Sequence, residues 1–190
     1  MNDLNFYPLK QNMWNDFEKL FGPKGACAGC WCMWWKLSNS QFENQKGEKN
    51  KKAFKKIVQS EQVPGIIAYY KDEPVGWCAI EPRESFKRLE TSRILKPVDD
   101  KNVWSIVCFY IKKEYRRKGV SKALIKAAVD YAKKKRAKVI EGYPIDLSKK
   151  ENYPDAFAYH GSMSSFKAAG FKEVLRRSET RPIMRYYISK

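Results

Sequence analysis

One short run of the chain has the residue types that an anion site needs. It reads Arg116-Arg117-Lys118-Gly119-Val120-Ser121, so three cations come directly before a glycine and two further residues. From Val120 onward, apolar residues recur every three or four positions, which predicts that a long amphipathic helix begins at Gly119. The first amides of a helix have no partner inside it, and its dipole is positive at that end. The run therefore predicts a site for a diphosphate group.

A strand must position this loop. The loop has neither the G-x-x-x-x-G-K-[ST] nor the G-x-G-x-x-G spacing, so it is neither of those two nucleotide-binding motifs. The segment before it, from Val103 to Ile111, is almost entirely apolar and rich in β-branched and aromatic residues. This composition predicts a central strand that is buried on both faces. The expected unit is a buried strand, a basic loop and a long helix.

The remaining segments predict shorter elements on either side of this unit. Helices are expected over residues 14–21, 53–58 and 162–169, and strands over 65–70, 75–80, 138–143, 171–175 and 183–188. The polar segment 38–50 has no periodicity and predicts a loop. Because no stretch has the composition of a linker, we expect a single domain over residues 1–190.

In this order of elements, the basic loop resembles the acetyl-CoA motif of the GNAT superfamily of N-acetyltransferases. That motif is R/Q-x-x-G-x-G/A, and Arg116-x-x-Gly119-x-Ser121 fits it with serine in the last place. The Ala168–Phe171 turn also resembles the superfamily's usual ending, and the Cys/Trp-rich loop of residues 25–35 is similar to that of a bacterial subgroup. The resemblance implies an α/β fold: a mixed, mostly antiparallel sheet of six to seven strands, flanked by helices and splayed apart at its centre.

The resemblance also implies an activity and a cofactor site. It implies an acetyl-CoA-dependent N-acetyltransferase in which an amine attacks the thioester directly, without a metal. The residues that match the pantetheine strand and the pyrophosphate loop are Phe109, Tyr110, Ile111, Arg116, Arg117, Lys118, Gly119, Val120 and Ser121. The acceptor is expected to be a small-molecule or peptide amine. An alternative is a non-catalytic module that binds acyl-CoA or RNA on the same fold.

Two departures from the superfamily leave the catalytic groups open. Phe166 stands where many members have a tyrosine that protonates the leaving thiolate, and Ser105 stands where some have a glutamate base. Glu141, Tyr159 and His160 are therefore the catalytic candidates. Glu141, in an apolar strand, could accept an ammonium proton; alternatively, strand alternation points it to solvent.

Each of the other candidates has an ordinary interpretation beside the catalytic one. His160 titrates in the useful range, although a lone histidine is more often an ordinary polar residue. Tyr159, or Tyr143 at a strand end, could donate a proton to the thiolate. Glu81 and Arg83 could orient the acceptor or form a surface ion pair.

The Trp-rich and Cys-rich segment of residues 25–35 could form one side of the site that binds the acceptor amine. Trp31 and Trp34, with Trp35, either line a pocket that receives the acceptor or cover an edge of the core. The spacing C-x-x-C-x-C of Cys27–Cys32 could supply three zinc ligands or a redox pair. A fourth ligand is hard to find, so we expect unliganded thiols and no metal. Tyr143 and Glu81 complete the set of expected acceptor contacts.

The charge of the chain does not by itself favour a nucleic-acid partner. The 190 residues include 38 Lys and Arg against 21 Asp and Glu, a formal net charge of +17. The basic loop would serve a phosphate-rich cofactor, and Lys133–Arg136 offset the dipole at a helix end; the remaining cations are scattered. No apolar stretch is long enough for a membrane span. We therefore expect a cytoplasmic protein, a monomer or homodimer, that binds no membrane and no nucleic acid.

Overall fold

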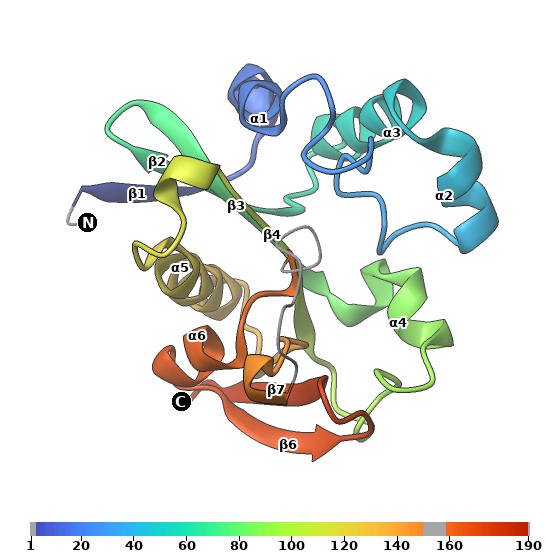
Figure 1. Cartoon of the computed structure of the whole chain (residues 1–190), viewed down its shortest axis with the longest axis vertical. Coiled ribbons are helices and arrows are strands. Elements are labelled where there is room, and N and C mark those ends of the chain that lie inside the picture. Colours follow the sequence, from blue (N-terminus) through green and yellow to red (C-terminus); the bar gives the residue numbers. More distant parts are fainter. Residues whose placement is uncertain (1–2, 150–158, 190) are drawn as a thin grey trace.

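The computed structural model describes residues 3–149 and 159–189, in which seven strands form one sheet (Figure 1). The order across the sheet is β1-β2-β3-β4-β5-β7-β6, and every neighbouring pair is antiparallel except β4 and β5. The strands are β1 Leu4–Pro8, β2 Gly65–Tyr70, β3 Glu73–Pro82, β4 Trp104–Ile111, β5 Val139–Gly142, β6 Lys172–Arg176 and β7 Pro182–Tyr187. The expected α/β fold with a mixed, mostly antiparallel sheet is confirmed.

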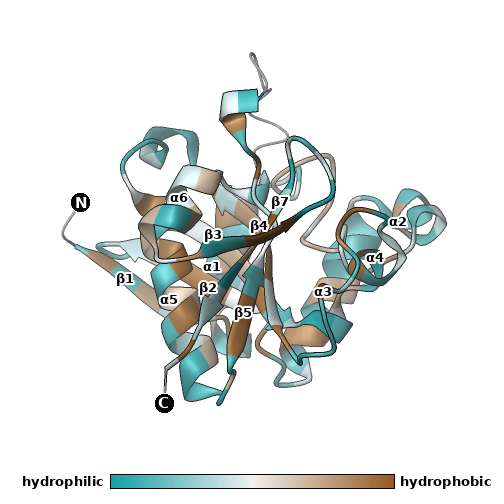
Figure 2. Cartoon of the chain, turned by 90° about the horizontal axis from the view of Figure 1, so that it is seen from below, coloured by the Kyte–Doolittle hydropathy of each residue, from teal (hydrophilic) through white to brown (hydrophobic). Residues whose placement is uncertain are grey.

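Helices cover both faces of this sheet. They are α1 Trp14–Phe21, α2 Asn39–Gln45, α3 Glu48–Gln59, α4 Lys87–Thr91, α5 Val120–Lys134 and α6 Met163–Ala168. Strand alternation divides the core: Ile66 and Ala68 pack on the side of α5, whereas Ile67 and Tyr69 pack on the side of α1. Hydrophobic residues concentrate in the central strands, and α5 carries residues of both kinds (Figure 2). Among the described residues, no helix is long and apolar enough to cross a bilayer.

The sheet parts at its centre, as expected. β4 and β5 pair only from Trp104 with Ile140 to Ile106 with Gly142, so the second half of β4 runs on without this neighbour. On its other side β4 carries an extra residue, because the register with β3 shifts between Cys108 and Ile106. The fully buried Phe166 fills the gap, and a Cβ on Gly142 would lie 2.1 Å from its ring. The bulge and this wedge keep the two strands apart.

The sequence-based elements agree with the structure except in two places. Residues 38–50, expected to be a loop, form α2 and the start of α3. The reason is local: Ser38 and Gln41 form a capping box, and Phe42 is the buried residue of a helix that is otherwise polar and shows no periodicity. The expected elements also omitted β1, an edge strand that pairs with β2. The polar sequence of residues 146–159 also predicts an irregular insertion, and residues 150–158 of it lie outside the described part of the chain.

Candidate functional site

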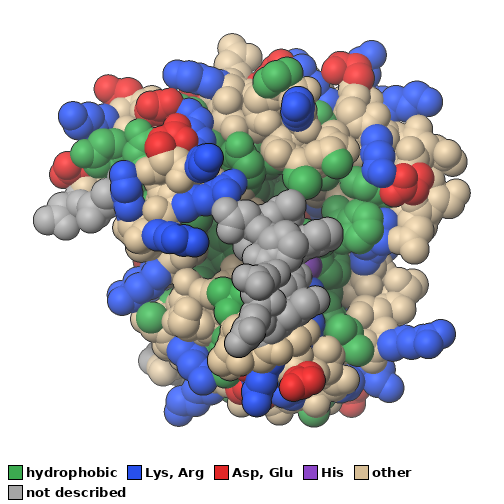
Figure 3. All heavy atoms as spheres, in the orientation of Figure 1, with side chains coloured by type: hydrophobic (Ala, Val, Ile, Leu, Met, Phe, Trp, Pro, Cys, Tyr) green, Lys and Arg blue, Asp and Glu red, His purple; other side chains and the backbone are tan. Residues whose placement is uncertain are grey.

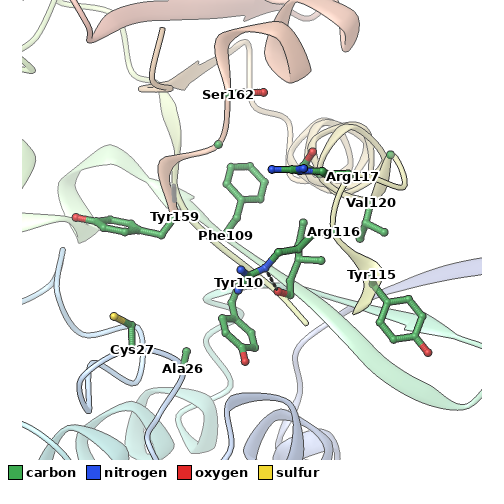
Figure 4. A pocket seen from close by; sticks show the side chains of 14 residues that line it. Ala26, Cys27, Phe109, Tyr110, Tyr115, Arg116, Arg117, Val120, Tyr159 and Ser162 are labelled. Carbon is green, nitrogen blue, oxygen red and sulfur yellow. Dashed lines mark hydrogen bonds between the residues drawn. The ribbon is translucent and has the colours of Figure 1, made fainter. Parts of the chain in front are cut away.

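A pocket of about 480 Å³ opens beside the unpaired half of β4 (Figure 4). Its lining residues are Ala26, Cys27, Phe109, Tyr110, Ile111, Tyr115, Arg116, Arg117, Gly119, Val120, Ser121, Tyr159, Gly161 and Ser162. The expected cofactor residues are therefore all at this pocket except Lys118, whose Nζ lies 5.8 Å from the centre of the Tyr115 ring. Arg117 and Val120 lie at one end of the pocket, Tyr159 and Cys27 at the other, and Phe109 and Tyr110 between them.

The end of the pocket at α5 has the geometry of an anion site. Gly119 is the N-cap of α5 in the left-handed conformation, with φ of 82°, and Arg117 also has a positive φ of 58°. These two residues turn the chain so that the first amides of a 15-residue helix face the pocket. The first turn of α5 contains no acidic residue. Arg116 is oriented by a 3.0 Å hydrogen bond from its Nε to the Ile111 carbonyl. The first amides of α5, the positive end of its dipole and the guanidinium groups of Arg116 and Arg117 thus lie at the same end of the pocket.

The opposite end of the pocket is mostly aromatic. Phe109 contacts Gly161, where a Cβ would lie 3.0 Å from the Phe109 ring and where φ is 76°. A side chain at this glycine would be both strained and crowded. The Cys27 side chain is exposed and lies on the same side of the pocket as Tyr159. This end can hold an extended, uncharged arm that runs along β4 from the anion site.

Glu141 lies in a closed network and does not line the pocket. Its side chain is 1% exposed, so it does not point to solvent; β5 is buried on both of its faces. Arg185 Nε donates to one carboxylate oxygen at 2.7 Å, and the Tyr143 hydroxyl donates to the other at 2.8 Å. Arg83 donates to the same hydroxyl and lies 3.6 Å from the carboxylate. Both oxygens are therefore occupied by partners from β7, from the residue that follows β5 and from the turn after β3.

Ser105 and Tyr143 belong to the same hydrogen-bond network as Glu141. The Ser105 hydroxyl lies 2.9 Å from the Tyr143 hydroxyl, and both side chains are buried. Burial and the Glu141 charge raise the pKa of Tyr143 far above its usual value. Arg185 extends the network to Asp99 through two hydrogen bonds, and this guanidinium holds the pKa of Asp99 far below its usual value. Sequence reasoning missed the roles of Arg185 and Asp99, because their partners are distant along the chain.

Glu81 is a buried residue with its own partner, not part of a surface ion pair. It pairs with Lys36, and both side chains are almost fully enclosed. Burial raises the pKa of Glu81, and the nearby Lys36 ammonium opposes this shift. Arg83 is also buried, and it donates to the carbonyls of Leu89 and Leu95. Glu81 and Arg83 thus fix the end of β3 and the segment that follows it.

His160 lies beside the parted strands and is 6% exposed. It hydrogen bonds to the backbone of Val107, the extra residue of the β4 bulge. Burial and the nearby Arg181 hold the pKa of His160 well below its usual value, so the imidazole is neutral near pH 7. The Tyr159 ring packs on it with centroids 3.9 Å apart. Of the three catalytic candidates, Tyr159 and His160 are therefore together, and Glu141 belongs to the separate network.

The tryptophans cover the core more than they line the pocket. Trp31 is 3% exposed and stacks against Trp14 and Phe21. Trp34 is half-buried, with the Arg88 guanidinium 3.6 Å from its ring centre. Neither residue lines the pocket, so the arrangement observed is the one in which they cover an edge of the core.

The five cysteines are free thiols in the described structure. Trp77 Nε1 donates to the Cys32 sulfur at 3.1 Å, and burial raises the pKa of Cys30 to about 11. Among residues 3–149 and 159–189, no group of three or more His, Cys, Asp or Glu side chains could hold a metal ion. Of these thiols, Cys27 reaches the pocket.

Comparison with known proteins places this geometry in context. Residues 31–143, more than half of the chain, match the model of the acetyltransferase (GNAT) family. No curated protein sequence matches. The paia N-acetyltransferase of Thermoplasma acidophilum, solved with coenzyme A, is 16% identical with a TM-score of 0.53; the alignment covers 97% of this chain and 99% of that one.

Two further solved structures show the same fold. The yncA protein from Salmonella typhimurium, solved with its cofactor acetyl-CoA, is 10% identical with a TM-score of 0.58 over 100% of this chain and 96% of that one. A NatC complex bound to Gag peptide and CoA is 11% identical with a TM-score of 0.54, over 98% and 99%. At these identities the likeness concerns the fold alone.

Proposed function

Because the chain belongs to the GNAT acetyltransferase family, we propose that it transfers an acetyl group from acetyl-CoA to a primary amine. The observation that carries this proposal is the pocket along β4, which joins an anion site at α5 to an aromatic channel. A molecule with a diphosphate at one end and an extended acyl-thioester arm at the other matches both parts. Solved structures with the same fold contain coenzyme A or acetyl-CoA, which supports the choice of donor.

The chain's own residues would divide the work as follows. The first amides of α5 and Arg117 would hold the diphosphate, and the unpaired half of β4 would lie along the pantetheine arm. The amine attacks the thioester carbonyl carbon, the C–S bond breaks, and the CoA thiolate leaves. His160 would accept the amine proton, and the Tyr159 hydroxyl would protonate the thiolate. Glu141, with both oxygens engaged, would hold β5 and β7 in place.

Charge on the surface gives no reason to prefer an RNA-binding module. On the face shown in Figure 3, Lys and Arg side chains are spread over many separate positions and are interspersed with Asp and Glu. A nucleic-acid site needs cations concentrated along a groove or face. The cations that are clustered in the sequence, Arg116 to Lys118, lie in the loop before α5, where they would bind acyl-CoA.

Calorimetric titration with acetyl-CoA tests the proposal. We expect Arg117→Ala to weaken acetyl-CoA binding by about 10- to 100-fold, as for loss of a charge-assisted hydrogen bond. Lys134→Ala removes the same charge from the exposed end of α5, remote from the pocket, and should leave the affinity unchanged. Equal losses in the two variants would show that the protein binds acetyl-CoA elsewhere or only by its net charge. Binding without release of CoA thiol to any amine would support the non-catalytic alternative.

A further inference from the structure

Two buried side chains beside the pocket have polar atoms without a hydrogen-bond partner. These atoms are Trp35 Nε1 and His160 Nδ1, and each residue is 6% exposed. Their rings are neighbours, with centroids 5.6 Å apart in an edge-to-face arrangement. Buried polar groups are almost always paired, by the protein or by a bound molecule. Two adjacent exceptions near the parted strands therefore point to a polar ligand.

The two atoms have opposite hydrogen-bonding character. Since His160 is neutral and its Nδ1 has no partner, its bond to the Val107 backbone comes from Nε2–H. Nδ1 therefore presents a lone pair, whereas the Trp35 indole N–H is a donor. A molecule that fills this place must offer one N–H or O–H and one acceptor atom.

Two guanidinium groups lie close to this pair or to its neighbour Tyr159. Arg88 also has a buried atom without a partner, Nη2, and it interacts electrostatically with Tyr159. Arg181 interacts electrostatically with His160. The carboxylates buried in this part of the described structure, Glu81 and Glu141, are already paired with Lys36 and Arg185. The ligand's acceptor atom is therefore matched best when it carries negative charge.

We infer that the acetyl acceptor is a free α-amino acid, whose carboxylate receives the N–H groups of Trp35 and Arg88 while its amine faces His160 Nδ1. This rests on the proposed acetyl transfer and adds the acceptor class to it. The amine proton passes to Nδ1, the nitrogen forms the new bond to the acetyl carbon, and CoA leaves as the thiolate. His160 is then a catalytic residue, and Trp35 determines specificity.

The test compares matched acceptors with the intact protein and acetyl-CoA. The probes are the L-amino acids, their amides, and spermidine, with CoA thiol release and product mass as readouts. We expect at least one free amino acid to exceed its own amide by roughly ten-fold or more in kcat/KM, because the amide lacks the negative charge. Preference for amides or spermidine would overturn the inference, as would acetyl-CoA binding with no amino acid acetylated.

Variants separate recognition from folding. Trp35→Phe removes the N–H and should raise the KM for the amino acid about ten-fold and leave the KM for acetyl-CoA unchanged. Trp104→Phe, on the opposite face against Tyr131, is the matched control and should change neither. An unchanged KM for the amino acid in Trp35→Phe overturns the inference while the proposed transferase function stands. If acetyl-CoA does not bind at all, the proposed function itself fails.

Discussion

The pocket along β4 and the ion-pair network around Glu141 lie on neighbouring strands, yet they treat polar groups in opposite ways. In the network, every oxygen of Glu141 has a partner, and Arg185 is shared between Glu141 and Asp99. At the pocket, the first amides of α5 have no helical partner, and Arg117 is held in a strained conformation. Polar groups that are fully paired stabilise the fold, whereas those left for a ligand mark the site.

The largest expected effect is on the network. Glu141→Gln leaves Arg185 and Arg83 buried beside a neutral group, and removing one partner of a buried ion pair typically costs about 3–5 kcal/mol. We expect the free energy of unfolding in urea to fall by this amount. Glu18→Gln breaks the more exposed pair with Lys51 and should cost less than about 1 kcal/mol. A Glu141→Gln protein of normal stability but without activity would instead make Glu141 the catalytic base.

The second effect concerns pH and His160. Its folded pKa lies well below the unfolded value of about 6.5, so below pH 6.5 the unfolded state binds the proton first. Stability is therefore lost as the pH falls from 6.5 toward the folded pKa, by at most about 1.4 kcal/mol per pH unit. Arg181 and Tyr159 are the ionisable side chains that adjoin His160.

The measurement is urea unfolding at pH 7.5 and 5.5. His160→Gln should lose about 1 kcal/mol less stability between these two values than the unmodified protein does. Identical losses in the two proteins would mean that His160 is protonated as readily in the folded state as in the unfolded chain.

The smallest expected change in the free energy of unfolding is at the pocket, and it is an increase where the other two are decreases. Arg117→Gly relieves a positive φ that an L residue adopts at a cost, so we expect the free energy of unfolding to rise by up to about 1 kcal/mol. The same change should weaken acetyl-CoA binding. Thermal unfolding with and without acetyl-CoA measures both effects. If Arg117→Gly lowered stability, the pocket loop would be a structural element like the network.

How far the sequence predicted each region depends on how local its interactions are. The basic loop and α5 are contiguous, so their spacing alone predicted the loop and the helix start that line one end of the pocket. Glu141 and Arg185 lie on strands whose register decides whether they meet, and no local pattern shows this. Trp31 was ambiguous for the same reason, since a tryptophan that covers a core and one that lines a pocket have the same local sequence. The polar helix α2 is not predicted from the sequence because its lack of periodicity hides it, and its capping box is the one local signal of its start.

Three residue pairs join β4 to β5. In mechanical terms the sheet is two smaller sheets, β1–β4 and β5–β7, which are joined by these pairs and have the Phe166 ring packed against Gly142 where the pairing ends. A change in the size of either residue would alter the separation of the two parts without rebuilding either of them. The width of the pocket near Gly161 can therefore change while the end at α5, built from β4 and α5, stays as it is.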